Sequence, residues 1–428
     1  MSTSRYAELL RPVSPTVLRY FAAVALVGFA VDGGIYAVLL NLYLVRLGLG
    51  PELIGLVNAA GTLSFALASL PAGLLGDRWS SRTLMLAGLG LMLAGSLLLP
   101  LADLLAEAAR LPWLLAQMAL LYLGLALFFV NTAPFVMSIV AGTQRTRVFS
   151  LQTALLSLAA FAGSLTGGLL PALIAAATGA SLTEARPFRG ALFVAGLGLL
   201  VAMLVLRAAR PELAPDAAGA PLGRGGIALA IGSVGGLLAL IALARMLQVA
   251  GIAAMSTFFN VYLDSQLQVP TAQIGVIIAL GRLLGAPAAL ATSALTGRFG
   301  NFAVVIGSTI ASAICLLPLA LIPHWGAAGF SFVSVIGISW IRYAASVVYF
   351  LELVPPTRRA LVSGVTEMAA GICFTALAFG GGYLAARVGY RELFLLSTAI
   401  TALSALVFWL AFRGRTPAAE SGVASGPG

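Results

Sequence analysis

Long apolar runs, separated by short polar segments, fill almost the whole chain. The runs lie at residues 18–44, 52–75, 83–102, 112–138, 148–174, 189–207, 237–263, 272–296, 302–322, 327–352, 360–386 and 392–412. About 20 residues of α-helix, at about 1.5 Å each, cross the hydrocarbon layer of a bilayer. An open sheet cannot satisfy its backbone hydrogen bonds there. The pattern therefore predicts an all-α membrane protein with 12 transmembrane helices.

The chain also repeats itself. Residues 51–78 return, much altered, at 271–298, and Asn41-Leu42-Tyr43-Leu44 returns as Asn260-Val261-Tyr262-Leu263. A duplication in register explains this spacing. An even number of helices per copy makes the copies parallel, related by an axis along the membrane normal. We therefore predict two pseudo-symmetric six-helix bundles.

The polar interruptions divide the chain into four parts. We assign residues 1–207 to an N-terminal six-helix bundle, 208–236 to a cytoplasmic linker, 237–412 to a C-terminal six-helix bundle and 413–428 to a disordered tail. The linker is rich in proline and glycine, as connecting segments are. A helix from residue 227 to 263 would be about 55 Å long, which is too long for one crossing. We therefore expect a break or a surface segment near Gly235 and Gly236.

Composition and charge place the protein in the cell membrane. Hydrophobic residues make up 61% of the chain and charged residues 9%, against roughly 25% charged residues in soluble domains. All 24 basic residues are arginine, and they concentrate on the side that holds both termini, which the positive-inside rule makes cytoplasmic. The net charge of +10 then sets orientation and attracts anionic lipid, and it gives no reason to expect a nucleic-acid partner. We expect a multi-pass monomer.

Five ionisable residues lie well inside predicted spans: Asp32, Arg245, Arg282, Arg342 and Glu367. A charge in lipid costs at least about 2.5 to 3.5 kcal/mol, so these side chains must face protein or water. Asp32, Arg282 and Arg342 lie nearest the middle of the membrane, where transport sites are usually found. Arg245 and Glu367 lie at similar depth, and a fixed ion pair that only joins two helices explains them as well as a pathway does.

Polar side chains at helical spacing extend this predicted pathway. Tyr36 shares a stripe with Asp32, Tyr349 shares one with Arg342, and Asn131 lies on a stripe of span 112–138. Hydrogen bonds between packed helices would give similar stripes. We assign the substrate and proton pathway to Asp32, Tyr36, Asn131, Arg245, Gln248, Arg282, Arg342, Tyr349 and Glu367.

Glycines cluster in spans 148–174 and 360–386, for example at Gly167, Gly168, Gly381 and Gly382. Small residues let helix backbones approach closely. We expect helix packing there, at a surface where the two halves slide or rock against each other.

The loop after the second span reads Gly73-Leu-Leu-Gly-Asp77-Arg78-Trp-Ser-Ser-Arg82. With two six-helix copies and cytoplasmic termini, this chain resembles the major facilitator superfamily of secondary transporters. The signature of that superfamily in this loop is a glycine, three residues, Asp-Arg and a basic residue soon after. The resemblance covers nearly the whole chain, and it implies the superfamily's fold of 12 helices in two bundles.

The resemblance also implies a conformational latch. In the family, the loop aspartate is thought to meet the positive N-terminus of the eleventh helix when the cavity opens outward. That helix follows Pro355-Pro356-Thr357-Arg358-Arg359 here, so we assign the latch to Gly73, Asp77, Arg78, Arg82, Arg358 and Arg359. The chain departs from the proton-coupled drug exporters of the family, which carry an arginine early in span 4, because positions 119–122 hold no charge.

The leading hypothesis is a secondary active transporter that moves a small solute by alternating access, with protons coupled through Asp32. Three intramembrane arginines against two carboxylates leave one positive charge, which suits export of anionic or amphipathic compounds. The alternatives are an uncoupled facilitator, or uniporter, and a non-transporting membrane sensor or scaffold. An enzyme is not expected, since no metal cluster, nucleophile elbow or phosphate loop occurs. We expect no cofactor and no metal, and name a small-molecule substrate, protons and the lipid bilayer as partners.

Overall fold

The structure is a computed structural model, and it describes residues 14–76, 78–140, 144–209, 226–355 and 358–414. Every regular element in these ranges is a helix. Eleven helical segments among the described residues are long and apolar enough to cross a membrane, and one shorter apolar helix accompanies them. The predicted all-α membrane architecture is therefore confirmed at this level.

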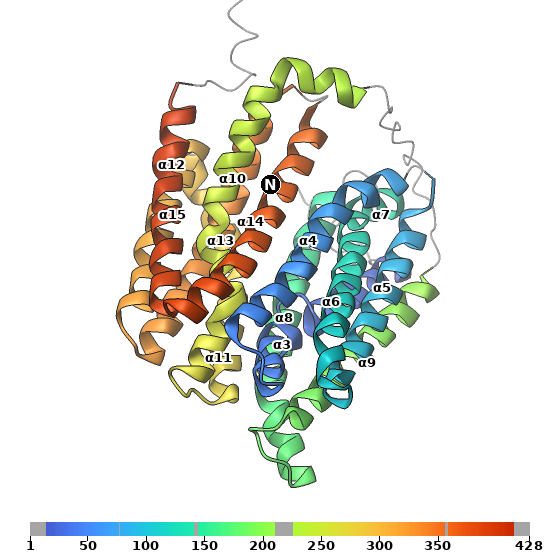
Figure 1. Ribbon diagram of the computed structural model, residues 1–428. Helices are drawn as coiled ribbons and strands as arrows, with labels where there is room; N and C mark the ends of the chain where they lie inside the picture. The colour runs from blue at the N-terminus through green and yellow to red at the C-terminus, as the bar shows by residue number, and fades with distance from the viewer. Residues whose placement is uncertain (1–13, 77, 141–143, 210–225, 356–357, 415–428) are drawn as a thin grey trace, which may run out of the picture.

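Two groups of helices lie side by side in Figure 1. The first group consists of α2 (Pro15–Ala30), α3 (Ile35–Arg46), α4 (Pro51–Leu75), α5 (Ser81–Leu98), η1 (Leu99–Leu104), α6 (Glu107–Val130), α7 (Thr132–Ile139), α8 (Arg145–Thr178) and α9 (Ala185–Ala208). The second group consists of α10 (Gly226–Ser265), α11 (Thr271–Leu283), α12 (Gly285–Leu321), α13 (Trp325–Glu352), α14 (Arg359–Arg387) and α15 (Tyr390–Phe412).

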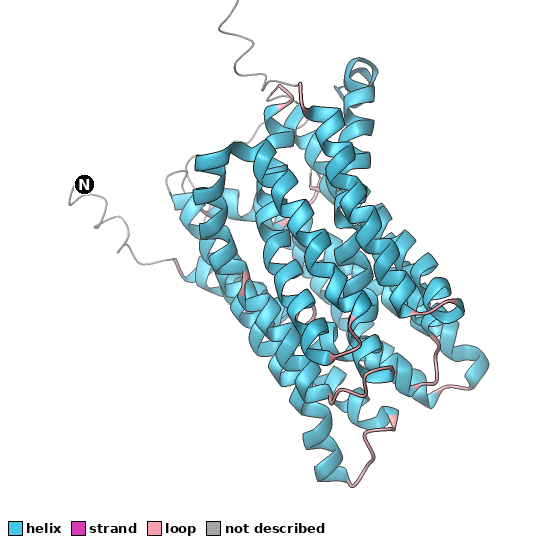
Figure 2. Ribbon diagram, turned by 90° about the vertical axis from the view of Figure 1, so that its left-hand side faces the viewer, coloured by secondary structure: helices cyan, strands magenta, loops and turns pink. Residues whose placement is uncertain are grey.

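The helices share one general direction, and the loops gather at its two ends (Figure 2). We call one end the closed face; there, residues 47–50, 179–184, 266–270 and 322–324 connect helices, at the bottom of Figure 1. We call the opposite end the linker face; residues 78–80 and 353–355 connect helices there. Local signals set some of these ends: the Ser80 hydroxyl accepts a hydrogen bond from the Thr83 amide at the start of α5, at 3.2 Å.

Three predicted spans contain breaks that the hydrophobic pattern did not predict. Residues 31–34 separate α2 from α3, Asn131 separates α6 from α7, and Leu284 separates α11 from α12. Conversely, α12 contains two helices that meet at Gly300, whose φ of 77° is not helical. Of the expected break or surface segment near Gly235 and Gly236, the helix shows no interruption, since α10 runs through both residues, but its ribbon bends near the linker face (Figure 1).

Glycines bring the two groups together near the closed face. A Cβ atom on Gly382 of α14 would lie 2.6 Å from the Pro51 carbonyl oxygen and 3.3 Å from Cα of Gly55, on α4. A Cβ on Gly275 of α11 would lie 2.6 Å from Cα of Gly168, on α8. Gly55 and Gly275 are equivalent in the sequence repeat. Gly168 corresponds to Gly381, the residue before Gly382. The two contacts therefore lie at corresponding places in the repeats, offset by one residue, and backbone touches backbone at both.

Candidate functional site

A cavity of about 460 Å³ lies between the two groups of helices. Its wall takes residues from α3, α4 and α6 on one side and from α10, α11, α13 and α14 on the other. Six of the nine predicted pathway residues line it: Asp32, Tyr36, Arg245, Arg282, Arg342 and Glu367. All five intramembrane ionisable residues therefore share one cavity, as lipid's exclusion of charge requires.

Asp32 lies in the break between α2 and α3, beside Gly33. Gly33 has a φ of 88°, which favours glycine, and its carbonyl accepts a 2.6 Å hydrogen bond from the Ser164 hydroxyl of α8. A Cβ on Gly33 would be only 2.7 Å from Nε of Arg282. Because Gly33 has no side chain, the Arg282 guanidinium can lie next to Asp32. The two charges interact, but no ion pair within 4.0 Å joins these described residues.

Arg245 and Glu367 are separated by Tyr343, so the ion pair considered from the sequence does not form in this structure. The Tyr343 hydroxyl donates a 3.2 Å hydrogen bond to Oε1 of Glu367. The guanidinium carbon of Arg245 lies 5.0 Å from the centre of the Tyr343 ring, within the range of a cation–π contact. The aromatic ring thus links a cation on α10 to a carboxylate on α14 without direct contact between them.

Arg342 of α13 is almost fully buried, with 2% of its surface exposed. Its Nη1 donates a 3.1 Å hydrogen bond to the Ser312 hydroxyl of α12, and its Nε is buried without a hydrogen-bond partner among the described residues. The charged neighbour that acts on it is Arg245, a like charge. Nothing in the described protein neutralises Arg342.

Three predicted pathway residues lie away from the cavity wall. Asn131 is buried at the break between α6 and α7, where its amide donates to the Leu127 carbonyl at 2.9 Å. Gln248 is fully buried and accepts a 3.3 Å hydrogen bond from Ser346. Tyr349 packs in an aromatic cluster with Phe302, Phe350, Phe408 and Phe412. In this structure these three side chains contact other helix residues and do not line the cavity.

Aromatic side chains that the sequence did not single out complete the cavity. Phe65 and Tyr122 line it from the first group of helices, and Trp340, Tyr343 and Phe374 line it from the second. Trp340 and Tyr343 are close to Arg342 along α13. The predicted polar stripe through Arg342 and Tyr349 was therefore the one sequence signal that pointed to this part of the helix. The cavity is a charged interior with an aromatic wall, typical of a small-molecule site.

Two asparagines seal the cavity toward the closed face. Nδ2 of Asn41 donates to the Thr257 carbonyl at 2.7 Å, and Nδ2 of Asn260 donates to the Val38 carbonyl at 2.9 Å. Asn41 and Asn260 are equivalent in the repeat, and so are Val38 and Thr257, since each carbonyl lies three residues before the asparagine of its own helix. The contact is reciprocal, and we call it the asparagine clamp.

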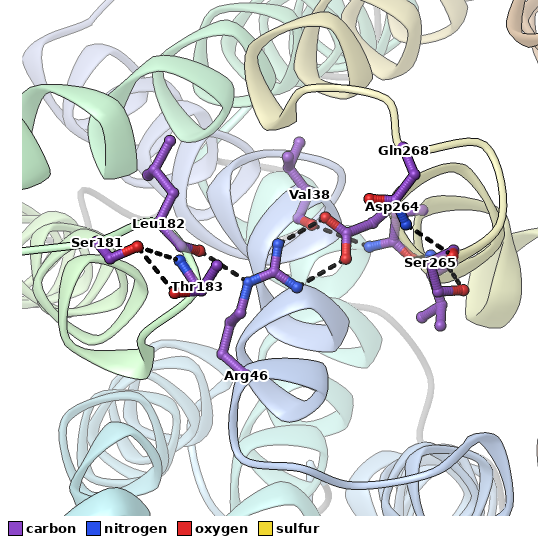
Figure 3. Close-up of polar contacts among 10 residues, drawn as sticks. Val38, Arg46, Ser181, Leu182, Thr183, Asp264, Ser265 and Gln268 are labelled. Carbon is purple, nitrogen blue, oxygen red and sulfur yellow. Dashed lines mark hydrogen bonds and ion pairs between the residues drawn. The ribbon is translucent and has the colours of Figure 1, made fainter.

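An ion pair covers the clamp on the closed-face side. Arg46 forms two hydrogen bonds with Asp264, at 2.7 and 2.6 Å, and its Nε donates to the Leu182 carbonyl at 2.9 Å (Figure 3). The two side chains are 17% and 10% exposed. Such a paired fork geometry is the strong form of this interaction. Together with the clamp and the glycine contacts, it joins the two groups of helices across the closed face.

The residues assigned to the latch lie at the linker face, and only some can be placed. Asp77 lies outside the described residues. Arg82 donates to the Arg207 carbonyl and Arg359 to the Leu351 carbonyl, both within their own groups of helices. Arg358 precedes the first turn of α14, and Arg78 is exposed. These described contacts of Arg82 and Arg359 do not join the two groups.

Comparisons with known proteins agree with this geometry. The sequence profile of the Major Facilitator Superfamily matches residues 21–345. No curated protein matches the chain in sequence.

Solved structures resemble the chain over nearly its whole length. A point mutant of the nucleoside transporter NupG has a TM-score of 0.73 at 15% identity and covers 93% of this chain and 100% of its own. A D-xylose–proton symporter has a TM-score of 0.72 at 14% identity, with coverages of 92% and 97%. A bacterial homologue of the human lysosomal transporter Spinster, inward-facing and unoccupied, has a TM-score of 0.68 at 16% identity, with coverages of 93% and 96%. At these identities the likeness shows a shared fold.

Proposed function

Since the chain belongs to the major facilitator superfamily, we propose that it is a secondary active transporter that carries a small anionic or amphipathic solute by alternating access. The observation that carries this proposal is a charged cavity between two repeats, joined across one face by contacts that span the repeats. Alternating access needs contacts of this kind, which can form in one state and separate in the other. Export is the direction we predict.

We further propose 12 crossings with both termini in the cytoplasm. In this arrangement α2 with α3 forms one crossing, α6 with α7 another, and α11 with the part of α12 before Gly300 a third. The bundles then comprise residues 1–207 and 237–412, with 208–236 as the cytoplasmic linker. The closed face is the outer face by the positive-inside rule, and the protein is a monomer in the cell membrane.

Asp32 is the proposed proton carrier. It lies at a helix break in the cavity wall, next to Arg282 but without a direct ion pair. Broken helices mark the binding sites of many secondary transporters, because backbone and side chain are both available there. A carboxyl group with a movable cationic neighbour can take up a proton in one state and release it in the other. Uniport remains the competing mode, in which no proton moves.

The test is solute flux into proteoliposomes of purified protein, screened across anions, drugs and sugars, with and without a pH gradient. We expect the gradient to drive accumulation in the wild type, and Asp32→Asn to abolish accumulation while downhill flux persists. Glu107→Gln is the matched control, because Glu107 is exposed at the start of α6 and does not line the cavity.

Each other outcome selects an alternative. Downhill flux without gradient-driven accumulation in the wild type would identify a uniporter. Absence of flux for every solute, in protein that is folded, would favour the sensor or scaffold. Intact accumulation in Asp32→Asn would remove Asp32 as the proton carrier.

A further inference from the structure

The charges of the cavity are unevenly distributed between its two sides. Asp32 and Arg282 lie beside each other and balance. Glu367 accepts its hydrogen bond from Tyr343, on whose ring Arg245 rests. Three arginines against two carboxylates leave one net positive charge in the cavity. Arg342 has no acidic neighbour to balance it among the described residues, so this excess lies between α10 and α13.

The two arginines on this side are also short of hydrogen-bond partners. Arg245 is 8% exposed, and among the described residues it makes no hydrogen bond and no ion pair, only the ring contact. Arg342 is 2% exposed and makes one hydrogen bond, to Ser312. Its Nε is buried and unpartnered within the described chain. A guanidinium carries a fork of N–H donors, and leaving them unpaired in a buried site is costly.

Both arginines nevertheless line the cavity, with aromatic rings next to them. Trp340 and Tyr343 are near neighbours of Arg342 along α13, the Tyr343 ring contacts Arg245, and Phe374 lines the same cavity from α14. Phe65 lines the cavity from α4, which packs against α14. A volume of about 460 Å³ is in the range of small-molecule sites and exceeds what a small inorganic anion needs. The site therefore has a cationic end and an apolar, aromatic body.

We infer that Arg245 and Arg342 form a subsite for the carboxylate of a small aromatic monoanion, whose ring lies against Trp340 and Phe374. A carboxylate matches the guanidinium fork and accepts two parallel hydrogen bonds from it. One negative charge cancels the one excess positive charge, whereas a dianion would leave the cavity net negative. This inference rests on the proposed transport function and names the substrate class of the same cavity.

The test uses binding, so it does not depend on flux. Purified protein in lipid nanodiscs is titrated with a series of aryl carboxylates from benzoate to 2-naphthoate, and with the matched neutral amides, by isothermal titration calorimetry. We expect carboxylates to bind and the amides to bind at least about tenfold more weakly, because the charge-assisted hydrogen bonds are lost. Arg342→Gln and Arg245→Gln should each weaken carboxylate binding by at least about tenfold.

Two further variants keep the result interpretable. Arg298→Gln is the matched control, since Arg298 is exposed and contacts the ring of its neighbour Phe299; it should bind as the wild type does. Arg342→Lys retains the charge and should fold even if Arg342→Gln does not, yet it should bind carboxylates more weakly than the wild type because the fork is lost.

Specific outcomes would overturn the inference. They are the absence of binding for every carboxylate in the series, equal binding of acids and amides, or wild-type affinity in both Arg342 variants. A protein that binds these acids through Arg245 and Arg342 but moves none of them would retain the subsite and refute transport. Gradient-driven flux of another solute, without binding of any aryl carboxylate, would support transport and refute the carboxylate subsite.

Discussion

Replacing Gly382 by alanine should shift the protein toward a state that is open at the closed face, whereas the same change at Gly380 should not. A Cβ atom on Gly382 would lie 2.6 Å from the Pro51 carbonyl oxygen and 3.1 Å from Cα of Glu52. Both are backbone atoms, which cannot rotate away. A Cβ on Gly380, two residues earlier in α14, would meet nothing within 4 Å.

The size of the shift follows from the overlap. Carbon atoms in good contact lie about 3.5 to 4.0 Å apart, so the start of α4 must withdraw from α14 by about half an ångström to one ångström. Overpacking of this kind costs about 1 to 3 kcal/mol. A state in which the two helices separate there escapes this cost, so its population should rise by about 5-fold to 150-fold relative to the closed state. Both variants gain similarly in helix propensity, and that gain cancels in the comparison.

Cysteine labelling measures the shift. Ser256→Cys places a thiol on the exposed cavity side of α10, in a background where Cys315 and Cys373, the free cysteines of the described chain, are replaced by serine. A membrane-impermeant thiol reagent is added from the closed-face side. Labelling should be faster with Gly382→Ala than with Gly380→Ala. Equal rates in two folded variants would show that α4 and α14 do not separate at this contact, and the account of how this face opens would be wrong.

Two further predictions concern the same motion. Asn41→Ala and Asn260→Ala should both speed labelling of Ser256→Cys from the closed face, by about fivefold for a lost hydrogen bond between the groups. Asn260→Ala should have at least as large an effect as Asn41→Ala, because Nδ2 of Asn260 also donates to the Ala37 carbonyl at 3.3 Å, whereas the second hydrogen bond of Asn41, from Asn58, lies within the first group of helices. An effect of Asn260→Ala on labelling no larger than that of Gly380→Ala would argue against the clamp. Asp77→Asn should lower solute turnover in proteoliposomes while the amount of protein inserted in the membrane is unchanged, and unaltered turnover would discard the latch.

The sequence predicted the helices well because the bilayer imposes their length and polarity. The first span shows where this reasoning ends. Residues 31–34 interrupt it, yet hydropathy averages over many positions and does not register a break at Asp32 and Gly33. Apolar length also could not separate α11 from α12 at Leu284.

The charged cavity residues could all be found from the sequence, whereas of the aromatic ones Tyr36 was predicted and Trp340, Tyr343 and Phe374 were not, for one physical reason. Lipid strongly disfavours ions, so the side chains of Asp32, Arg282 and Arg342 had to face protein or water. An aromatic ring is accepted by lipid, by a neighbouring helix or by a cavity, so spacing alone could not distinguish Tyr349, which packs among phenylalanines, from Trp340, which lines the cavity. The contact of Arg245 with Tyr343 in place of Glu367 depends on side-chain directions that only the structure gives.

The asparagine clamp places few constraints on how the sequences of the two repeats could diverge. Each side-chain amide donates a hydrogen bond to the backbone of the opposite helix, at Thr257 or Val38. Any amino acid at those positions would supply the same backbone carbonyl. Neither recipient position had to keep a particular side chain after the ancestral gene doubled. A contact made to peptide oxygen in this way tolerates sequence divergence in both repeats, so the two copies could acquire different side chains and still keep it.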